Sequence, residues 1–270
     1  MTKVTFIWHD CFIVECDAAN LIFDYWLDAD GQNAEFPAFL DSLDPAKPLY
    51  VFVSHGHKDH FNPAIFGWAT RFPAIRYVVS SDVFKRIRHI VSPDSVYSGP
   101  KVAAELLTAL RRNESYADKL VNIRAFPSTD IGCAYMVELG AQRIFHAGDL
   151  NAWIWLDEST EQEVRKALGD YNACLRDIAA YLSSVEGSQA FDYCFFPVDS
   201  RIGREYWTGA KIFVEKFEVR HFFPMHFDLG DEAERRERLR DALNFNNYAN
   251  LSRGEYIPLA IHATSFITET

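Results

Sequence analysis

Short apolar runs separated by polar turns dominate the first part of the chain. Val4–Trp8, Phe12–Glu15 and Leu21–Phe23 are rich in Val, Ile and Phe, which predicts three short strands. Leu49–Val53 is apolar at every position, as expected of a strand that is buried on both faces. This last strand delivers His55 at its C-terminal edge.

The pattern then alternates between helices and strands without a low-complexity linker. A short helix is expected from Pro63, a strand at Ile75–Val79, a helix from Ser81 or Asp82, and a further helix over Val102–Arg112. In the second half, the expected strands are Val121–Phe126, Ala134–Glu138, Arg143–His146, Tyr193–Pro197 and His221–Pro224, and the expected helices are Glu161–Ser184 and Glu232–Leu243. Two halves of strand-then-helix character with no linker predict one α/β domain over residues 1–270.

Composition narrows the class of function. The net charge of −11 disfavours a protein that coats nucleic acid, because an acidic surface repels phosphate backbones. The negative charge does not exclude a small anionic substrate, because a metal ion, where a protein binds one, dominates the field around it. The oligomeric state stays open, with a homo-oligomer as one alternative. The basic positions between Arg71 and Arg112 are interpreted as a solvated helix face.

Cysteine usage and the N-terminus predict a cytoplasmic protein. The five cysteines are odd in number, widely spaced and without a C-x-x-C pair, which is typical of reduced thiols. The first residues run into a strand pattern with no signal peptide, and no apolar run is long enough to cross a membrane.

The strongest chemical signal is the segment from Ser54 to His60, which follows the buried strand. His55, His57, Asp59 and His60 place three imidazoles and a carboxylate within six residues. His55 and His57 are two apart, so an extended loop directs both to one side, while Asp59 and His60 can face a second metal. Such ligands suit Zn²⁺, and also Mn²⁺, Fe²⁺ or Ni²⁺. The alternative, a His-rich surface loop, rarely follows a buried strand.

This H-x-H-x-D-H segment resembles the signature of the metallo-β-lactamase fold superfamily. Within the segment Phe145–Asp149, Asp149 resembles the aspartate that bridges two metals. Within Pro224–Phe227, His226 resembles the last histidine ligand. The start, Trp8–Phe12 leading to Leu21–Asp24, resembles the branch that includes ascorbate-6-phosphate lactonase-like proteins. The resemblance implies a four-layer αββα sandwich with the metal site at one edge.

Each weaker ligand candidate also has a purely structural interpretation. Asp149 could simply end a strand after a glycine, and His226 could be a core histidine; their order along the chain favours the ligand role. The superfamily normally supplies one more histidine before the bridging aspartate, and residues 127–132 contain none. Asp130 is the nearest donor there, and it is expected either to replace that histidine or only to turn the chain.

The remaining candidates concern substrate and catalysis. Asp59 is the candidate catalytic residue, which would orient a metal-bound hydroxide or take its proton. His9, Asp199 and Arg201 are candidate substrate-binding residues, although a structural histidine and a loop ion pair explain them equally well.

The resemblance implies a hydrolase that attacks a small ester, lactone or phosphoester. Because one fold hosts several chemistries, three alternatives remain: a non-catalytic metal-binding protein, an iron-dependent redox enzyme and a nuclease.

Overall fold

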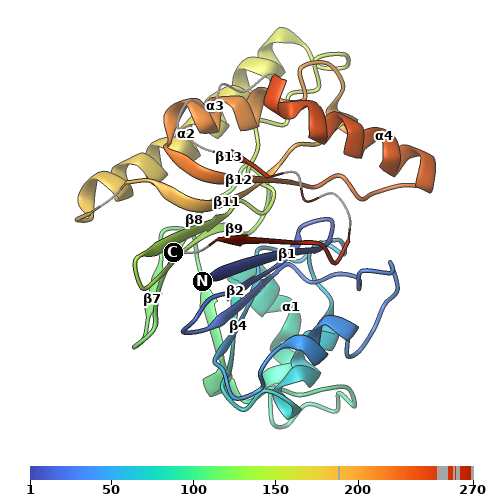
Figure 1. Cartoon of the computed structure of the whole chain (residues 1–270), viewed down its shortest axis with the longest axis vertical. Coiled ribbons are helices and arrows are strands. Elements are labelled where there is room, and N and C mark those ends of the chain that lie inside the picture. The colour runs from blue at the N-terminus through green and yellow to red at the C-terminus, as the bar shows by residue number, and fades with distance from the viewer. Residues whose placement is uncertain (188, 248–254, 258, 260–261, 269–270) are drawn as a thin grey trace.

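Two β-sheets face each other and helices cover their outer faces (Figure 1). The computed structural model describes residues 1–187, 189–247, 255–257, 259 and 262–268. Helix α1 lies outside the first sheet, and α2, α3 and α4 lie outside the second (Figure 1). The expected four-layer αββα sandwich is therefore confirmed.

The first sheet combines an antiparallel edge with a parallel half. Its strands, in spatial order, are β14 (Ser265–Thr268), β1 (Thr2–Trp8), β2 (Cys11–Glu15), β3 (Asn20–Phe23), β4 (Leu49–Val53), β5 (Ile75–Ser80) and β6 (Leu107–Leu110). Pairing is antiparallel from β14 to β3 and parallel from β3 to β6. The parallel strands therefore present their C-terminal ends at one edge.

The second sheet repeats this plan. Its strands, in spatial order, are β13 (Glu255–Tyr256), β12 (Val219–Met225), β11 (Phe191–Pro197), β10 (Gln142–His146), β9 (Cys133–Leu139), β8 (Val121–Pro127) and β7 (Ser115–Ala117). Strands β10 to β13 are parallel and strands β7 to β10 are antiparallel.

Helices α2 and α4 begin at side-chain caps that the sequence supplies. The α-helices are α1 (Ser81–Val91), α2 (Glu161–Ser184), α3 (Thr208–Lys216) and α4 (Glu232–Leu243), and the 3-10 helices are η1 (Ala38–Ser42), η2 (Pro63–Thr70), η3 (Ala104–Leu106), η4 (Ser200–Ile202) and η5 (Asn244–Asn247). Thr160 with Glu163 and Asp231 with Glu234 form capping boxes at α2 and α4, which satisfy the first amides of those helices. No described helix is long and apolar enough to cross a membrane.

Strand β4 shows why the metal loop starts from a fixed position. Tyr50 and Phe52 point into the core between the sheets, whereas Leu49, Val51 and Val53 point into the core under α1. All five residues are buried, so a one-residue shift in register would move every side chain into the core on the other face of the sheet and disrupt the packing there.

The predicted elements hold with one clear error and several omissions. Val102–Arg112 is not helical: it forms the short η3 and then β6, which pairs in parallel with β5. Its Ala, Leu and Glu favour a helix locally, but hydrogen bonding to the open edge of β5 outweighs that preference. The sequence patterns also missed α3, β7, β13 and β14. The basic positions between residues 71 and 112 are spread over several elements and do not form one helix face.

Alkaline pH is expected to destabilise the fold. Burial raises the pKa of Cys133 from 9.0 to about 12, and it raises the pKa of the Cys11 and Cys194 thiols well above the ordinary value. Because these thiols ionise more readily in the unfolded chain, their contribution to stability is complete below pH 9.0 and is lost as pH rises toward 12. Urea unfolding should show a lower midpoint near pH ~10 than near pH ~7. An equal or higher midpoint at alkaline pH would contradict this. All five cysteines are unpaired and buried.

Candidate metal centre

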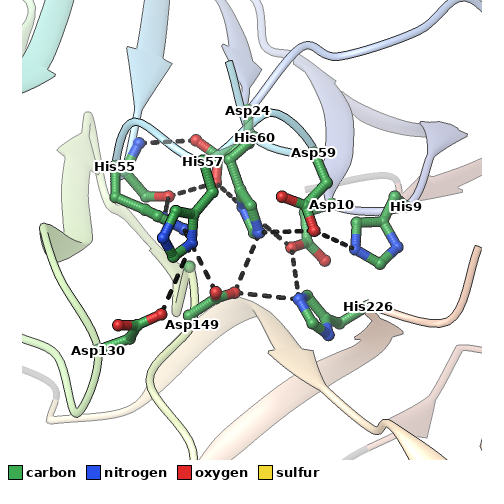
Figure 2. Close-up of polar contacts among 12 residues, drawn as sticks. His9, Asp10, Asp24, His55, His57, Asp59, His60, Asp130, Asp149 and His226 are labelled. Carbon is green, nitrogen blue, oxygen red and sulfur yellow. Dashed lines mark hydrogen bonds and ion pairs between the residues drawn. The ribbon is translucent and has the colours of Figure 1, made fainter. Parts of the chain in front are cut away.

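Every predicted site residue follows the C-terminal end of a strand. The His55–His60 loop follows β4, Asp130 follows β8, Asp149 follows β10, and His226 follows β12. Figure 2 shows these side chains converging from both sheets. The sandwich thus gathers donors that lie up to 171 residues apart, from His55 to His226.

The first group of donors contains His55, His57, Asp130 and Asp149. Their ligand atoms lie within 4.8 Å of one another. His55 Nε2 is 2.9 Å from His57 Nδ1 and 3.3 Å from Asp149 Oδ2, and His57 Nδ1 is 3.7 Å from Asp130 Oδ2 (Figure 2). The structure therefore places Asp130 beside His55 and His57, and its replacement of the missing histidine stays a prediction.

The Asp130 loop is fixed by Arg112, which sequence analysis had assigned to a helix face. Arg112 Nη2 donates to the Asp130 carbonyl at 2.6 Å, and Arg112 Nε donates to the Gly132 carbonyl at 3.2 Å. Cys133 N donates to the Ser54 carbonyl at 3.0 Å, which ties the same loop to the residue before His55.

This close approach requires glycine. Gly132 has φ +77°, and a Cβ there would lie 2.1 Å from Ser54 O and 2.5 Å from His55 Cβ. Gly148, immediately before Asp149, has φ +51°, and its Cβ would lie 2.8 Å from Ser54 Cβ. Two glycines therefore allow the three loops to meet.

The second group contains Asp10, His60, Asp149 and His226, again with ligand atoms within 4.8 Å of one another. Asp149 Oδ1 is 3.1 Å from His60 Nε2 and 3.2 Å from His226 Nε2. Asp149 therefore directs Oδ2 toward the first group and Oδ1 toward the second, as a bridging carboxylate would (Figure 2).

Asp59 and His9 lie beside the second group. Asp59 Oδ2 is 3.7 Å from His9 Nε2 and 4.0 Å from His60 Nε2, and its side chain remains 24% exposed. Burial alone would raise the pKa of Asp59, but His9 and His60 hold it below its usual range. Burial also lowers the pKa of His9 to about 4, so its imidazole is neutral at physiological pH.

Two buried carboxylates were missed by sequence reasoning. Asp10 is fully buried, with Oδ2 at 3.1 Å from His60 Nδ1 and 3.9 Å from His226 Nε2. Asp24 is also buried and accepts from Ser54 N at 2.7 Å, Ser54 Oγ at 2.5 Å and His60 Nδ1 at 2.9 Å. Both follow the first strands, and their only sequence signal is an acidic residue directly after an apolar run.

Three buried histidines of the two donor groups each have an oxygen acceptor at Nδ1. His60 Nδ1 faces Asp24, His226 Nδ1 faces Asp199 Oδ2 at 2.9 Å, and His55 Nδ1 faces Ser54 Oγ at 3.0 Å. Such partners fix the ring so that Nε2 keeps a lone pair for a metal.

The electrostatics fit a cation-binding site. Burial alone would lower the pKa of His226, but the Asp10 and Asp149 carboxylates raise it to about 10. Burial and neighbouring carboxylates raise the pKa of Asp10 to about 8. The buried carboxylates stabilise positive charge in this cluster. Protons supply that charge without a metal, and a bound metal ion would displace them.

Buried side-chain atoms without hydrogen-bond partners also indicate a metal site. Among the described residues, His60 Nε2, His226 Nε2, Asp149 Oδ1 and both Asp10 carboxylate oxygens are buried without a hydrogen-bond partner. Buried polar atoms are rarely left unsatisfied, so a converging set of them fits a bound metal. Imidazole and carboxylate donors suit Zn²⁺, Mn²⁺, Fe²⁺ or Ni²⁺.

Asp199 and Arg201 lie behind and beside His226. Asp199 is fully buried and accepts from Arg201 Nε at 2.8 Å, from Arg201 Nη2 and from His226 Nδ1. Arg201 Nη2 also lies 3.2 Å from His226 Nδ1. This geometry favours a positioning role for Asp199, while the partly exposed Arg201 borders the site.

Comparison with known proteins now decides the family. The sequence profile of the beta-lactamase superfamily domain (Lactamase_B_3) matches residues 3–166, which is more than half of the chain. The chain belongs to this superfamily. The matched region includes the His55–His60 loop, Asp130 and Asp149, and His226 lies beyond it.

A relative of this chain agrees with that assignment. A UPF0173 metal-dependent hydrolase from Desulforamulus reducens is 30% identical over 156 residues, covering 54% of this chain and 61% of the relative. This chain therefore spans less than two thirds of that relative's length.

Solved structures share the fold at low sequence identity. Igni18, a metallo hydrolase from Ignicoccus hospitalis, superposes with a TM-score of 0.56 at 13% identity and covers 99% of both chains. CmlA, a diiron beta-hydroxylase from Streptomyces venezuelae, gives a TM-score of 0.56 at 12% identity, covering 98% of this chain and 54% of CmlA.

Proposed function

We propose that this superfamily domain is a metal-dependent hydrolase acting on a small ester, lactone or phosphoester. The observation that carries the proposal is the position of Asp149, whose two oxygens face two separate groups of imidazole nitrogens. Two metals sharing one carboxylate form a compact centre that can act on both sides of a scissile bond.

In this proposal the donors divide between two metals. His55, His57 and Asp130 would hold the first, His60, His226 and Asp59 would hold the second, and both would share Asp149. Asp10 lies close enough to the second metal's ligands to contribute a further oxygen. Zn²⁺ is our first choice, and the oxygen-rich second group also suits Mn²⁺, Fe²⁺ or Ni²⁺.

The protein's own residues would perform the remaining tasks. When bound, the metals would supply Lewis acidity, which lowers the pKa of a coordinated water toward ~7. Asp59, partly exposed beside the centre, would orient that water and accept its proton. Asp199 would keep the His226 ring in place.

Arg201 would bind an anionic group of the substrate. Its Nε and Nη2 are held by Asp199, and no hydrogen bond from Nη1 is present among the described residues. A guanidinium fixed on one edge offers its free Nη1 to a carboxylate or phosphate.

We further propose that the chain belongs to the branch that includes ascorbate-6-phosphate lactonase-like proteins. The Trp8–Phe12 segment supports this, because it places His9 and Asp10 at the centre. Five unpaired thiols support a reducing compartment, the cytoplasm.

The function is tested by comparing chelated and metal-reconstituted protein on p-nitrophenyl acetate, a γ-lactone and bis(p-nitrophenyl) phosphate. We expect hydrolysis of at least one of them that is lost with chelator and restored by Zn²⁺ or Mn²⁺. Stoichiometric metal binding without turnover would favour a non-catalytic metal-binding protein. Turnover of the phosphodiester alone would narrow the substrate class to phosphoesters, the class that a nuclease also hydrolyses.

Asp130→Ala should lower metal occupancy from about two to about one while leaving the fold intact. The loss falls on the His55–His57 position because Asp130 is the fourth donor there. In the native protein this same metal should leave first under mild chelation. Elemental analysis during dialysis against a weak chelator measures both effects.

The neighbouring Ile131→Ala serves as a matched control, because that exposed side chain carries no donor. If Asp130→Ala keeps both metals at native affinity, Asp130 only shapes the turn.

A further inference from the structure

His9 differs from the other histidines of the centre in what faces its Nδ1 atom. The backbone N–H of Asp228 donates to His9 Nδ1 at 3.1 Å. A neutral imidazole carries one proton, so a nitrogen that accepts a hydrogen bond leaves that proton on the other nitrogen. His9 is therefore held as the tautomer with its proton on Nε2.

In their neutral, metal-binding form, His60, His226 and His55 carry the opposite tautomer. Their Nδ1 atoms face oxygen acceptors on Asp24, Asp199 and Ser54. The Ser54 hydroxyl donates its only proton to Asp24, so its oxygen accepts from His55. Their Nε2 atoms are left with lone pairs, whereas His9 Nε2 is a donor and cannot bind a metal.

The position of His9 is fixed on three sides. His9 N donates to Asp228 Oδ2 at 3.0 Å, and His226 N donates to the His9 carbonyl at 3.3 Å. Its ring lies 4.4 Å from the His226 ring between centroids, and His262 Nε2 lies 3.0 Å from Asp228 Oδ2. His9 also has φ +56°, a left-handed conformation that is uncommon outside glycine and that its neighbours hold in place.

The Nε2–H of His9 points into the centre without a hydrogen-bond acceptor. Within the described residues this atom is buried and unpaired, with Asp59 Oδ2 at the long distance of 3.7 Å. One ring nitrogen of His9 lies within 4.8 Å of a ligand atom on each of Asp59, His60 and His226. A substrate oxygen at this position would supply the missing acceptor.

We infer that His9 is not a metal ligand but a preorganised hydrogen-bond donor for the substrate oxygen that gains negative charge during hydrolysis. This inference rests on the proposed function for its substrate class: an ester or lactone carbonyl oxygen, or a phosphoryl oxygen. A fixed donor aimed at developing charge in a site closed to water contributes roughly 10²- to 10³-fold to the rate.

The direct test is NMR on protein with nitrogen-labelled histidine, loaded with an NMR-active isotope of Cd²⁺. We expect metal–nitrogen couplings for His55, His57, His60 and His226, and none for His9. The His9 proton should stay on Nε2 both with and without Cd²⁺. A coupling to His9, or loss of that proton on loading, overturns the inference.

Two variants test the role in turnover. His9→Asn keeps an acceptor for the Asp228 amide and tolerates positive φ, but its side chain is too short to place a donor at the Nε2 position. His9→Gln can place an amide donor there. We expect both to retain native metal content. On the substrate hydrolysed in the panel, kcat should fall roughly 10²- to 10³-fold in His9→Asn with KM little changed, and His9→Gln should recover part of it.

His89→Gln, at an exposed position of α1, is the matched control for the chemistry of the substitution. Loss of one metal in both His9 variants, or native kcat in His9→Asn, contradicts the donor role. The two proposals fail separately: a protein that binds no Cd²⁺ refutes the proposed metal centre, whereas Cd²⁺ bound through His9 refutes only this inference.

Discussion

Asp149→Asn is expected to reduce hydrolysis at least roughly a thousandfold, about 4 kcal/mol of transition-state stabilisation, and to lower metal content from two ions to at most one. The substitution preserves the size of the side chain but replaces one oxygen with an amide NH₂. In either orientation of the new amide, its NH₂ group replaces one of the two anionic oxygens. One of the two donor groups then faces a hydrogen-bond donor instead of a metal-binding oxygen.

Activity on the reactive substrate, elemental analysis and thermal unfolding measure this prediction together. Asp157→Asn is the matched control, because that exposed carboxylate only pairs with Arg204. If Asp149→Asn retains two metals and most of its activity, Asp149 does not bridge the two groups.

Gly132→Ala should destabilise the protein by at least ~3 kcal/mol and weaken metal binding at the His55–His57 position. The new Cβ would lie 2.1 Å from the Ser54 carbonyl oxygen, which is far inside contact distance, so the loop must move. That movement displaces the carbonyl that accepts from Cys133 and shifts His55 next to it. For a chain of this size the melting temperature should fall by roughly 10 °C.

Gly140→Ala is a matched control for the backbone conformation. Gly140 has φ +61°, but a Cβ there meets nothing within 4 Å. The Gly140→Ala variant should lose only ~1 kcal/mol of folding stability and keep native metal binding. Equal losses in the two variants would mean that backbone strain alone, without the contact to Ser54, explains the effect.

The sequence identified most of the side chains that converge in the two donor groups, because its strongest signal is local. His55, His57, Asp59 and His60 lie within six residues after a strand whose every position is buried, so strand direction alone places them at one edge. Asp149 and His226 also follow strands, which is why their order along the chain sufficed.

Residues that reach the centre through long-range packing were harder to predict. Asp10 and Asp24 follow apolar runs like many turn residues, and nothing local shows that both are completely buried beside His60. Arg112 was assigned to a helix face because Val102–Arg112 is rich in helix-favouring residues. Its true role depends on β6 pairing with β5, which brings it to the Asp130 loop.

The sequence alone could not distinguish the proposed metal ligands from the proposed donor among the histidines. His9 and His60 are both buried imidazoles in the same cluster. Only the partner of each Nδ1, a backbone amide for His9 and a carboxylate for His60, distinguishes them. Those partners lie 219 and 36 residues away in the chain.

The central claim is that two metal ions share Asp149, and anomalous X-ray diffraction from crystals grown with Zn²⁺ tests it most directly. We expect two anomalous peaks, one contacted by His55 and His57 and the other by His60 and His226, with one Asp149 oxygen on each. A single peak not contacted by Asp149, or no peak at these histidines, would contradict the account.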